Sequence, residues 1–125
     1  MHKRLKNHSL SVRNALNGIF WVLYTQPNFQ LHVLAGFCIM IAAYLLSLSY
    51  VECAVLALTV VFVLVCELIN TAIEAFVDLL SSEWQGQSKV IKDVSAGMVL
   101  VSAIGSVFIG AFIFIPHLLP LLLLI

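Results

Sequence analysis

The sequence predicts an all-α integral membrane protein, with an N-terminal amphipathic helix on the bilayer surface and three transmembrane helices. Of its 125 residues, 62% are hydrophobic and only 10% are charged, whereas soluble domains carry about 25% charged residues. The mean hydropathy is +1.11. Three apolar runs are long enough to cross a hydrocarbon core of about 30 Å. Because no internal repeat is apparent, we expect residues 1–125 to form a single domain.

The first predicted element, residues 9–24, is an amphipathic helix that lies on the membrane surface. Trp21 and Tyr24 suit the interface between lipid and water, where aromatic side chains gather. We expect residues 25–28, which include Pro27, to break this helix. The apolar residues at helical spacing are Leu10, Val12, Leu16, Ile19, Phe20 and Leu23, and the polar residues opposite them are Arg13, Asn14 and Asn17.

Three longer helices follow, and we predict them over residues 31–50, 53–80 and 91–115. The first half of 53–80 is almost purely apolar, whereas its second half carries acidic side chains. The third helix is rich in small residues, which allow helices to pack closely in lipid. We expect Pro116 and Pro120 to disturb the apolar tail beyond residue 115. The small residues are Ser95, Gly97, Ser102, Ala103, Gly105, Ser106 and Gly110.

The basic residues predict the orientation of the chain. All six lie either at the N-terminus or between the second and third predicted spans. In a chain with three spans, these two regions lie on the same side of the membrane. The positive-inside rule therefore puts the N-terminus and this polar segment in the cytoplasm. A small basic cluster beside apolar helices favours anionic lipid headgroups, so we expect no nucleic-acid partner. The residues are Lys3, Arg4, Lys6, Arg13, Lys89 and Lys92.

The most informative feature is a polar stripe in the second half of the 53–80 helix. Positions 67, 70, 71, 74 and 78 follow helical spacing and fall on one face. Each ionisable group in a membrane helix costs roughly 2.5–3.5 kcal/mol on insertion scales, so such groups mark a functional site. The alternative is a polar seam between helices, but such seams use Ser, Thr or Asn rather than several acids. The residues are Glu67, Asn70, Thr71, Glu74 and Asp78.

These residue types suit phosphoryl transfer at a membrane surface. Carboxylates hold Mg²⁺, which typically binds one or two protein oxygens together with nucleotide phosphates. The deeper carboxylate, Glu67, is placed to take a proton from a lipid hydroxyl as a general base. Lys92 supplies a cation for a phosphate, and phosphoryl transfer requires little else. The sequence has no GxxxxGK[ST] or GxGxxG motif, so a P-loop or Rossmann nucleotide site is excluded.

The blocks ELINTAIEAFVD (residues 67–78) and KDVSAG (residues 92–97) resemble the prokaryotic diacylglycerol kinase and undecaprenol kinase family. The resemblance extends upstream through residues 15–18 and 28–32. It implies a three-span homotrimer in the inner membrane of a prokaryote, with active sites shared between subunits. It also implies transfer of the γ-phosphate of Mg²⁺-bound ATP to the hydroxyl of a membrane lipid alcohol at the cytoplasmic face. The sequence resembles the undecaprenol branch slightly more than the diacylglycerol branch.

The resemblance also implies roles for individual residues. Glu67 is the expected catalytic base, and Glu67 and Asn70 are expected to contact the acceptor lipid. Glu74 is the expected metal ligand. The residues expected to bind ATP are Glu74, Glu83, Trp84, Lys92 and Asp93.

One position departs from the family pattern. The family usually has a second metal-binding Glu before the first span, where this chain has Gln26. An amide oxygen can coordinate Mg²⁺ but brings no negative charge, so we expect weaker metal binding, or a member that has lost activity. A non-catalytic scaffold or cation-binding subunit is the alternative function. An ion-coupled transporter fits less well, because the acids lie at one end of the helix rather than at the midplane.

Overall fold

A computed structural model describes residues 2–80 and 85–123, and within these two segments the only regular elements are α-helices. The helices are α1 (His2–Thr25), α2 (Pro27–Leu45), α3 (Tyr50–Leu80) and α4 (Gln85–Leu122). By length and composition, α2, α3 and residues 86–120 of α4 are each able to cross a membrane. The structure thereby confirms the predicted all-helical class and its three candidate spans.

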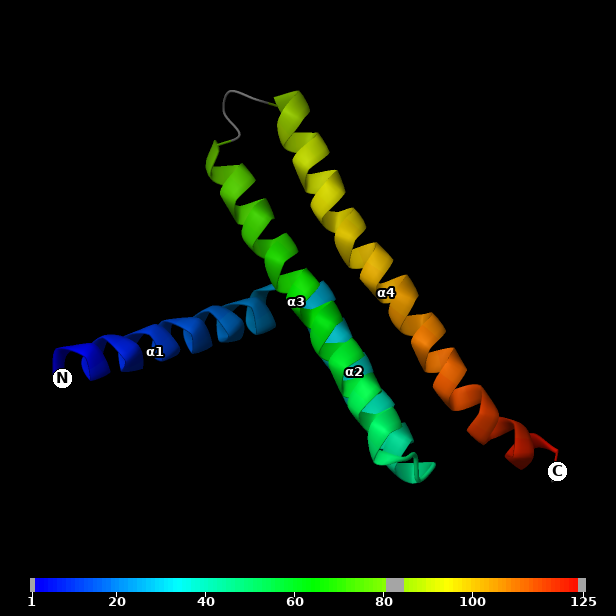
Figure 1. Cartoon of the computed structure of the whole chain (residues 1–125). Coiled ribbons are helices and arrows are strands. Elements are labelled where there is room, and N and C mark those ends of the chain that lie inside the picture. The colour runs from blue at the N-terminus through cyan, green and yellow to red at the C-terminus, as the bar shows by residue number, and fades with distance from the viewer. Residues whose placement is uncertain (1, 81–84, 124–125) are drawn as a thin grey trace.

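The helices form an antiparallel arrangement in which α3 is the central element (Figure 1). α4 lies beside α3 over most of its length, α2 packs against α3 from another side, and α1 projects sideways from the bundle. The free end of α1 lies far from α3 and α4 (Figure 1). α3 therefore contacts every other helix, and its side chains decide what the bundle encloses.

α3 is much longer than α2, and this difference sets the depth of the polar stripe. At 1.5 Å per residue, the 19 residues of α2 span about 29 Å and the 31 residues of α3 about 46 Å. Gly36 of α2 packs directly on Val60 of α3. An equal number of residues leads from Gly36 back to Pro27 and from Val60 forward to Ile69. The stripe therefore begins at the level where α2 starts and continues beyond it.

The break between α1 and α2 is shorter than expected. Gln26 alone separates the two helices, with an extended backbone (φ −109°, ψ 104°), and Pro27 begins α2. A residue before proline is driven out of the helical region, and proline is well tolerated at a first helical position because its missing N–H would be unpaired there. The side chain of Gln30 donates to the carbonyl oxygen of Leu23 at 2.9 Å and so ties the two helices together.

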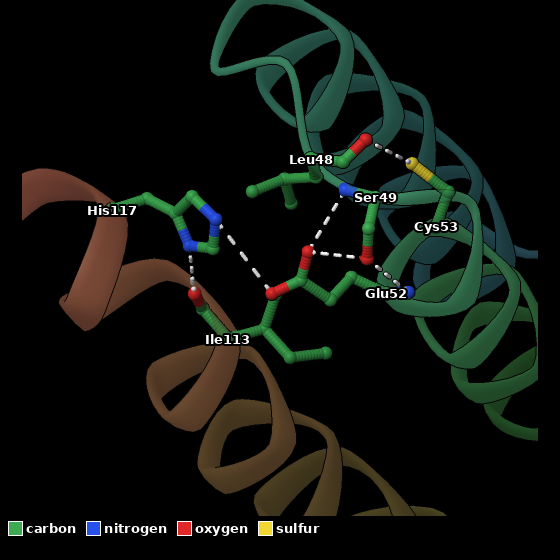
Figure 2. A network of polar contacts seen from close by, with 6 residues as sticks. All are labelled: Leu48, Ser49, Glu52, Cys53, Ile113 and His117. Atoms are coloured by element: carbon green, nitrogen blue, oxygen red, sulfur yellow. Dashed lines mark hydrogen bonds and ion pairs between the residues drawn. The ribbon is translucent and has the colours of Figure 1, made fainter.

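The turn between α2 and α3 is specified by local hydrogen bonds. Ser47 adopts a left-handed conformation (φ 54°), and the N–H groups of Ser47 and Leu48 close the end of α2 on the carbonyls of Tyr44 and Ala43. Ser49 then caps α3 reciprocally with Glu52, whose Oε2 accepts from the Ser49 N–H at 2.8 Å (Figure 2). Helix α3 therefore starts at Tyr50, before the expected residue 53.

α4 continues through Pro116 and Pro120 to Leu122, whereas the sequence suggested an end at residue 115. Proline is tolerated in membrane helices because neighbouring groups satisfy the freed backbone carbonyls. One turn of this extension contacts α3: His117 Nε2 lies 3.7 Å from Glu52 Oε1, and His117 Nδ1 lies 2.9 Å from the carbonyl oxygen of Ile113 (Figure 2). Both side chains are about one-third exposed. Glu52 thus links the two helices.

We expect Gly36→Ala to lower the melting temperature of the purified protein. A Cβ at position 36 would lie 2.5 Å from Val60 Cγ1, and the stiff, β-branched valine cannot withdraw without moving α3. Overpacking of this kind typically costs about 1–3 kcal/mol. Gly110→Ala is the matched control, because a Cβ there meets nothing within 4 Å in the chain. Thermal unfolding in detergent measures both, and Val60→Ala should restore the Gly36→Ala protein.

Candidate active site

The polar stripe of α3 faces the inside of the bundle at its deep end. Glu67, Asn70 and Thr71 are only 3%, 6% and 5% exposed. Glu74, one turn further along, is half-buried, and Asp78 is exposed. The stripe therefore rises from the protein interior to its surface, and its deepest acid, Glu67, is enclosed by protein.

A chain of hydrogen bonds connects α4 to this stripe. The Ser95 hydroxyl donates to Asn70 Oδ1 at 2.7 Å, and Asn70 Nδ2 donates to Glu74 Oε1 at 3.1 Å. Ser95 is 4% exposed, so the first bond lies in the protein interior. The Glu74 carboxylate is therefore held by an amide that is itself held from the neighbouring helix.

Two ion pairs lie at the end of the hairpin formed by α3 and α4. Lys92 Nζ pairs with Asp78 Oδ1 across the two helices, whereas Lys89 pairs with Asp93 along α4. Asp93 is mostly exposed, and its partner Lys89 lies one turn before it on the same helix. Exposed ion pairs contribute at most about 1 kcal/mol, so a nucleotide phosphate can compete with Asp78 for Lys92 at little cost.

Glu67 is the most enclosed ionisable group of the stripe. Among the described residues, none donates a hydrogen bond to its carboxylate. The carboxylate oxygens nevertheless remain slightly accessible from outside the protein. His32 of α2 and Glu74 lie close to Glu67. The Glu67 oxygens are therefore available to accept a hydrogen bond from a hydroxyl group that enters the site.

The donor set fits a metal ion that arrives with phosphate groups. Within the described segments, no three His, Cys, Asp or Glu side chains gather as a metal cage. Mg²⁺ rarely needs such a cage, since one or two carboxylates and the nucleotide phosphates complete its shell. In the same segments, Asn70 is the single partner of the Glu74 carboxylate and binds Oε1. Glu74 Oε2, which accepts no hydrogen bond from these residues, is thus available to bind a metal ion.

An apolar groove of about 750 Å³ runs between α3 and α4 and reaches the buried end of the stripe. Cys66, the neighbour of Glu67, and Gly97 and Val94 on α4 lie at this end. The groove is nearly free of polar surface, as expected for a surface that contacts lipid tails or another helix. Its further lining residues are Leu58, Thr59, Phe62, Met98, Val101, Ser102, Gly105, Ser106 and Ile109.

The structure brings most of the expected site residues together, but not all of them. Asn70 and Glu74 lie beside α4 together with Lys92, and Glu67 lies on the same face of α3. Asp93 pairs with Lys89 along α4. Glu83 and Trp84 lie outside the described residues. Sequence reasoning treated Ser95 as a small packing residue and missed its bond to Asn70. Its position one helical turn after Lys92, on the same face, was the available signal.

Comparison with known proteins identifies the family. A family model described as prokaryotic diacylglycerol kinase matches residues 13–114. A diacylglycerol kinase from Synechocystis sp. is 40% identical over 117 residues, which cover 93% of this chain and 67% of the relative. An undecaprenol kinase from Bacillus subtilis is 38% identical over 105 residues, covering 84% and 85%. A diacylglycerol kinase from Helicobacter pylori is 38% identical over 80 residues, covering 64% and 62%. The chain belongs to the prokaryotic diacylglycerol kinase family, and it is a membrane lipid kinase of the diacylglycerol or undecaprenol kinase type.

Proposed function

We propose that this protein transfers the γ-phosphate of ATP, bound with Mg²⁺, to the hydroxyl of a membrane lipid alcohol at the cytoplasmic face of the membrane. The observation that carries the proposal is the depth of the stripe. Glu67 is buried near the level where α2 begins, while Glu74 and Lys92 lie further out along the hairpin of α3 and α4. A lipid hydroxyl can reach Glu67 from the bilayer, and a nucleotide can reach Glu74 and Lys92 from water.

Each residue then has a chemical role. Glu67 accepts the proton of the lipid hydroxyl as the hydroxyl oxygen attacks the γ-phosphorus. The bond from the γ-phosphorus to the bridging oxygen breaks, and ADP leaves. Lys92 exchanges its ion pair with Asp78 for one with a phosphate oxygen. Glu74 would bind the metal ion through Oε2. The metal supplies neutralisation of the charge that develops on the phosphate oxygens. Asn70 lies between Glu67 and Glu74 on α3 and, through its bond to Glu74, fixes the second carboxylate relative to the first.

Orientation and assembly complete the proposal. Basic residues at the N-terminus and around the segment between α3 and α4 favour a cytoplasmic site. We propose a homotrimer in which a neighbouring subunit packs along the groove between α3 and α4. Gly97 and Gly105 line this groove, and a Cβ at either would meet nothing within 4 Å in the chain. A second helix can therefore approach α4 closely, as small residues permit in lipid.

The test is transfer of labelled γ-phosphate to purified lipids. The protein, reconstituted in nanodiscs, is given labelled ATP with diacylglycerol in one reaction and undecaprenol in another. Label in the extracted lipid supports the kinase, and the ratio of kcat/KM for the two lipids identifies the preferred acceptor. If thermal unfolding shows that the protein is folded and neither lipid carries label, the scaffold or cation-binding alternative is supported.

We expect Gln26→Glu to lower the Mg²⁺ concentration that gives half-maximal turnover. Gln26 caps α2 at the level of the stripe, and a carboxylate there adds the negative charge that its amide lacks. Asn14→Asp, on the exposed part of α1 well before Gln26, adds the same charge away from the stripe and is the control. A Mg²⁺ titration of initial rates compares the three proteins, and an unchanged midpoint in Gln26→Glu would contradict a metal role for position 26.

A further inference from the structure

We propose that Ser95 is a positioning residue for the metal ligand, acting through Asn70. Its hydroxyl fixes which way the Asn70 amide points, and the amide in turn holds the Glu74 carboxylate. This inference rests on the proposed role of Glu74 in binding the metal that accompanies the nucleotide.

The direction of the hydrogen bonds follows from the chemistry of the groups. An ionised carboxylate only accepts hydrogen bonds, so Asn70 must present its NH₂ group to Glu74. This places Asn70 Oδ1 on the opposite side of the amide, where it needs a donor. Among the described residues, Ser95 supplies that donor at 2.7 Å. Rotation of the amide by half a turn would set its oxygen against the carboxylate and leave the Ser95 hydroxyl facing an NH₂ group.

Burial makes this donor hard to replace. Asn70 and Ser95 are 6% and 4% exposed, so bulk water does not reach the bond between them. A buried acceptor that loses its donor is costly, and Asn70 would reorient to recover one. The Ser95 Oγ also lies 3.0 Å from the carbonyl oxygen of Lys92 in its own helix. Because a hydroxyl has one proton, the shorter contact indicates that Ser95 donates it to Asn70. This hydrogen bond joins α4 to α3 one turn after Lys92.

Ser102 provides a matched comparison on the same helix. It lies two helical turns after Ser95 and is similarly buried, at 7% exposed. Its hydroxyl, however, donates to the carbonyl oxygen of Val99 at 2.8 Å, within α4. Loss of this hydroxyl removes a local helix contact and touches no residue of the stripe. Ser102→Ala therefore reports the general cost of removing a buried serine hydroxyl from α4.

The experiment measures metal binding directly. Wild type, Ser95→Ala and Ser102→Ala are reconstituted in nanodiscs and titrated with Mn²⁺ by electron paramagnetic resonance, with a non-hydrolysable ATP analogue present. Outer partners of metal ligands typically contribute 10–100-fold to affinity, so we expect Ser95→Ala to weaken Mn²⁺ binding about 10-fold. Ser102→Ala should match wild type, and Ser95→Thr, which retains the hydroxyl, should bind Mn²⁺ far better than Ser95→Ala. If Ser95→Ala does not fold, Ser95→Cys replaces it, because a thiol of similar size is a weak donor.

A double-mutant comparison separates positioning from general stability. If Ser95 acts through Asn70, then Ser95→Ala added to Asn70→Ala should cause no further loss of Mn²⁺ affinity. Equal Mn²⁺ affinity in Ser95→Ala, Ser102→Ala and wild type would overturn the role of Ser95 and leave the kinase proposal intact. A further loss in the Asn70→Ala background would also overturn it. Absence of nucleotide-dependent Mn²⁺ binding in folded wild type would instead overturn the proposed function itself.

Discussion

Glu67→Gln is expected to reduce phosphate transfer to lipid by about 10²–10⁴-fold, the range typical of a lost general base. The amide has nearly the same shape as the carboxylate but cannot take a proton from the acceptor hydroxyl. Glu67 is 3% exposed, so water is poorly placed to substitute for it. Nucleotide binding should survive, because Glu74 and Lys92 lie further out along the hairpin of α3 and α4. Labelled lipid product measures the first effect, and binding of a fluorescent ATP analogue measures the second.

Glu52→Gln is the matched control for this experiment. Glu52 lies on the same helix, at the end remote from the stripe. There it caps the helix and contacts His117. Glutamine can also fill its capping position, so α3 should keep its start. Turnover in Glu52→Gln should remain near that of wild type. Wild-type turnover in folded Glu67→Gln would rule out a base at this position and would favour a non-catalytic role for the stripe.

Glu74→Gln is expected to produce a different defect, in which the requirement for Mg²⁺ rises steeply. A bound metal contributes several kcal/mol to the stabilisation of transition-state charge, and each 1.36 kcal/mol is a factor of ten in rate. We therefore expect turnover at low Mg²⁺ to fall by about 100-fold or more. The change also removes the charged acceptor of the Asn70 bond, so the amide itself becomes less well held. Initial rates over a wide range of Mg²⁺ concentrations measure the effect.

The form of the Mg²⁺ titration decides what Glu74 does. If Glu74 holds the metal, excess Mg²⁺ should recover part of the lost turnover in Glu74→Gln but none in Glu67→Gln. Glu52→Gln again serves as the control and should titrate like wild type. A loss of turnover in Glu74→Gln that is equal at every Mg²⁺ concentration would assign Glu74 to another step.

Together the two variants also distinguish the kinase from its alternatives. A scaffold or cation-binding subunit transfers no phosphate to either lipid, and it tolerates Glu67→Gln. A transporter would need its acids at the bilayer midplane, but Glu67 lies near the level where α2 begins, and Asp78 is exposed beyond it. The position of the stripe favours chemistry at the membrane surface.

Several elements could be predicted from the sequence because they depend on local patterns. Helical spacing placed Glu67, Asn70 and Glu74 on one face, and long apolar runs located the spans. Helix ends were harder to predict. Residue 53 was the expected start of α3, but the cap formed by Ser49 and Glu52 moves it to Tyr50. The end of α4 was also missed, since proline breaks helices in water but is tolerated where neighbouring groups satisfy the backbone.

Contacts between helices were beyond the reach of sequence patterns. The pairing of Lys92 with Asp78, and of Ser95 with Asn70, depends on how α3 and α4 are aligned, and small residues along α4 permit many alignments. For the same reason, the pairing of Asp93 with Lys89 along α4 was not anticipated. Adjacent residues on a helix point in different directions, so Asp93 pairs along α4 while Lys92 pairs across to α3.

The sequence by itself determined that this protein lies in a membrane, that one helix carries a row of acids, and that these acids suit phosphate chemistry. Composition and helical periodicity are local properties, and they survive in any arrangement of the helices. Only the tertiary structure decided how deep each acid lies and which groups hold it. The depth of the acids follows from the contact of Gly36 with Val60. The position of the Glu74 carboxylate follows from the Ser95 hydroxyl on another helix, which acts through Asn70. Both require two helices to be in register, and register is a property of side-chain packing rather than of either sequence segment alone.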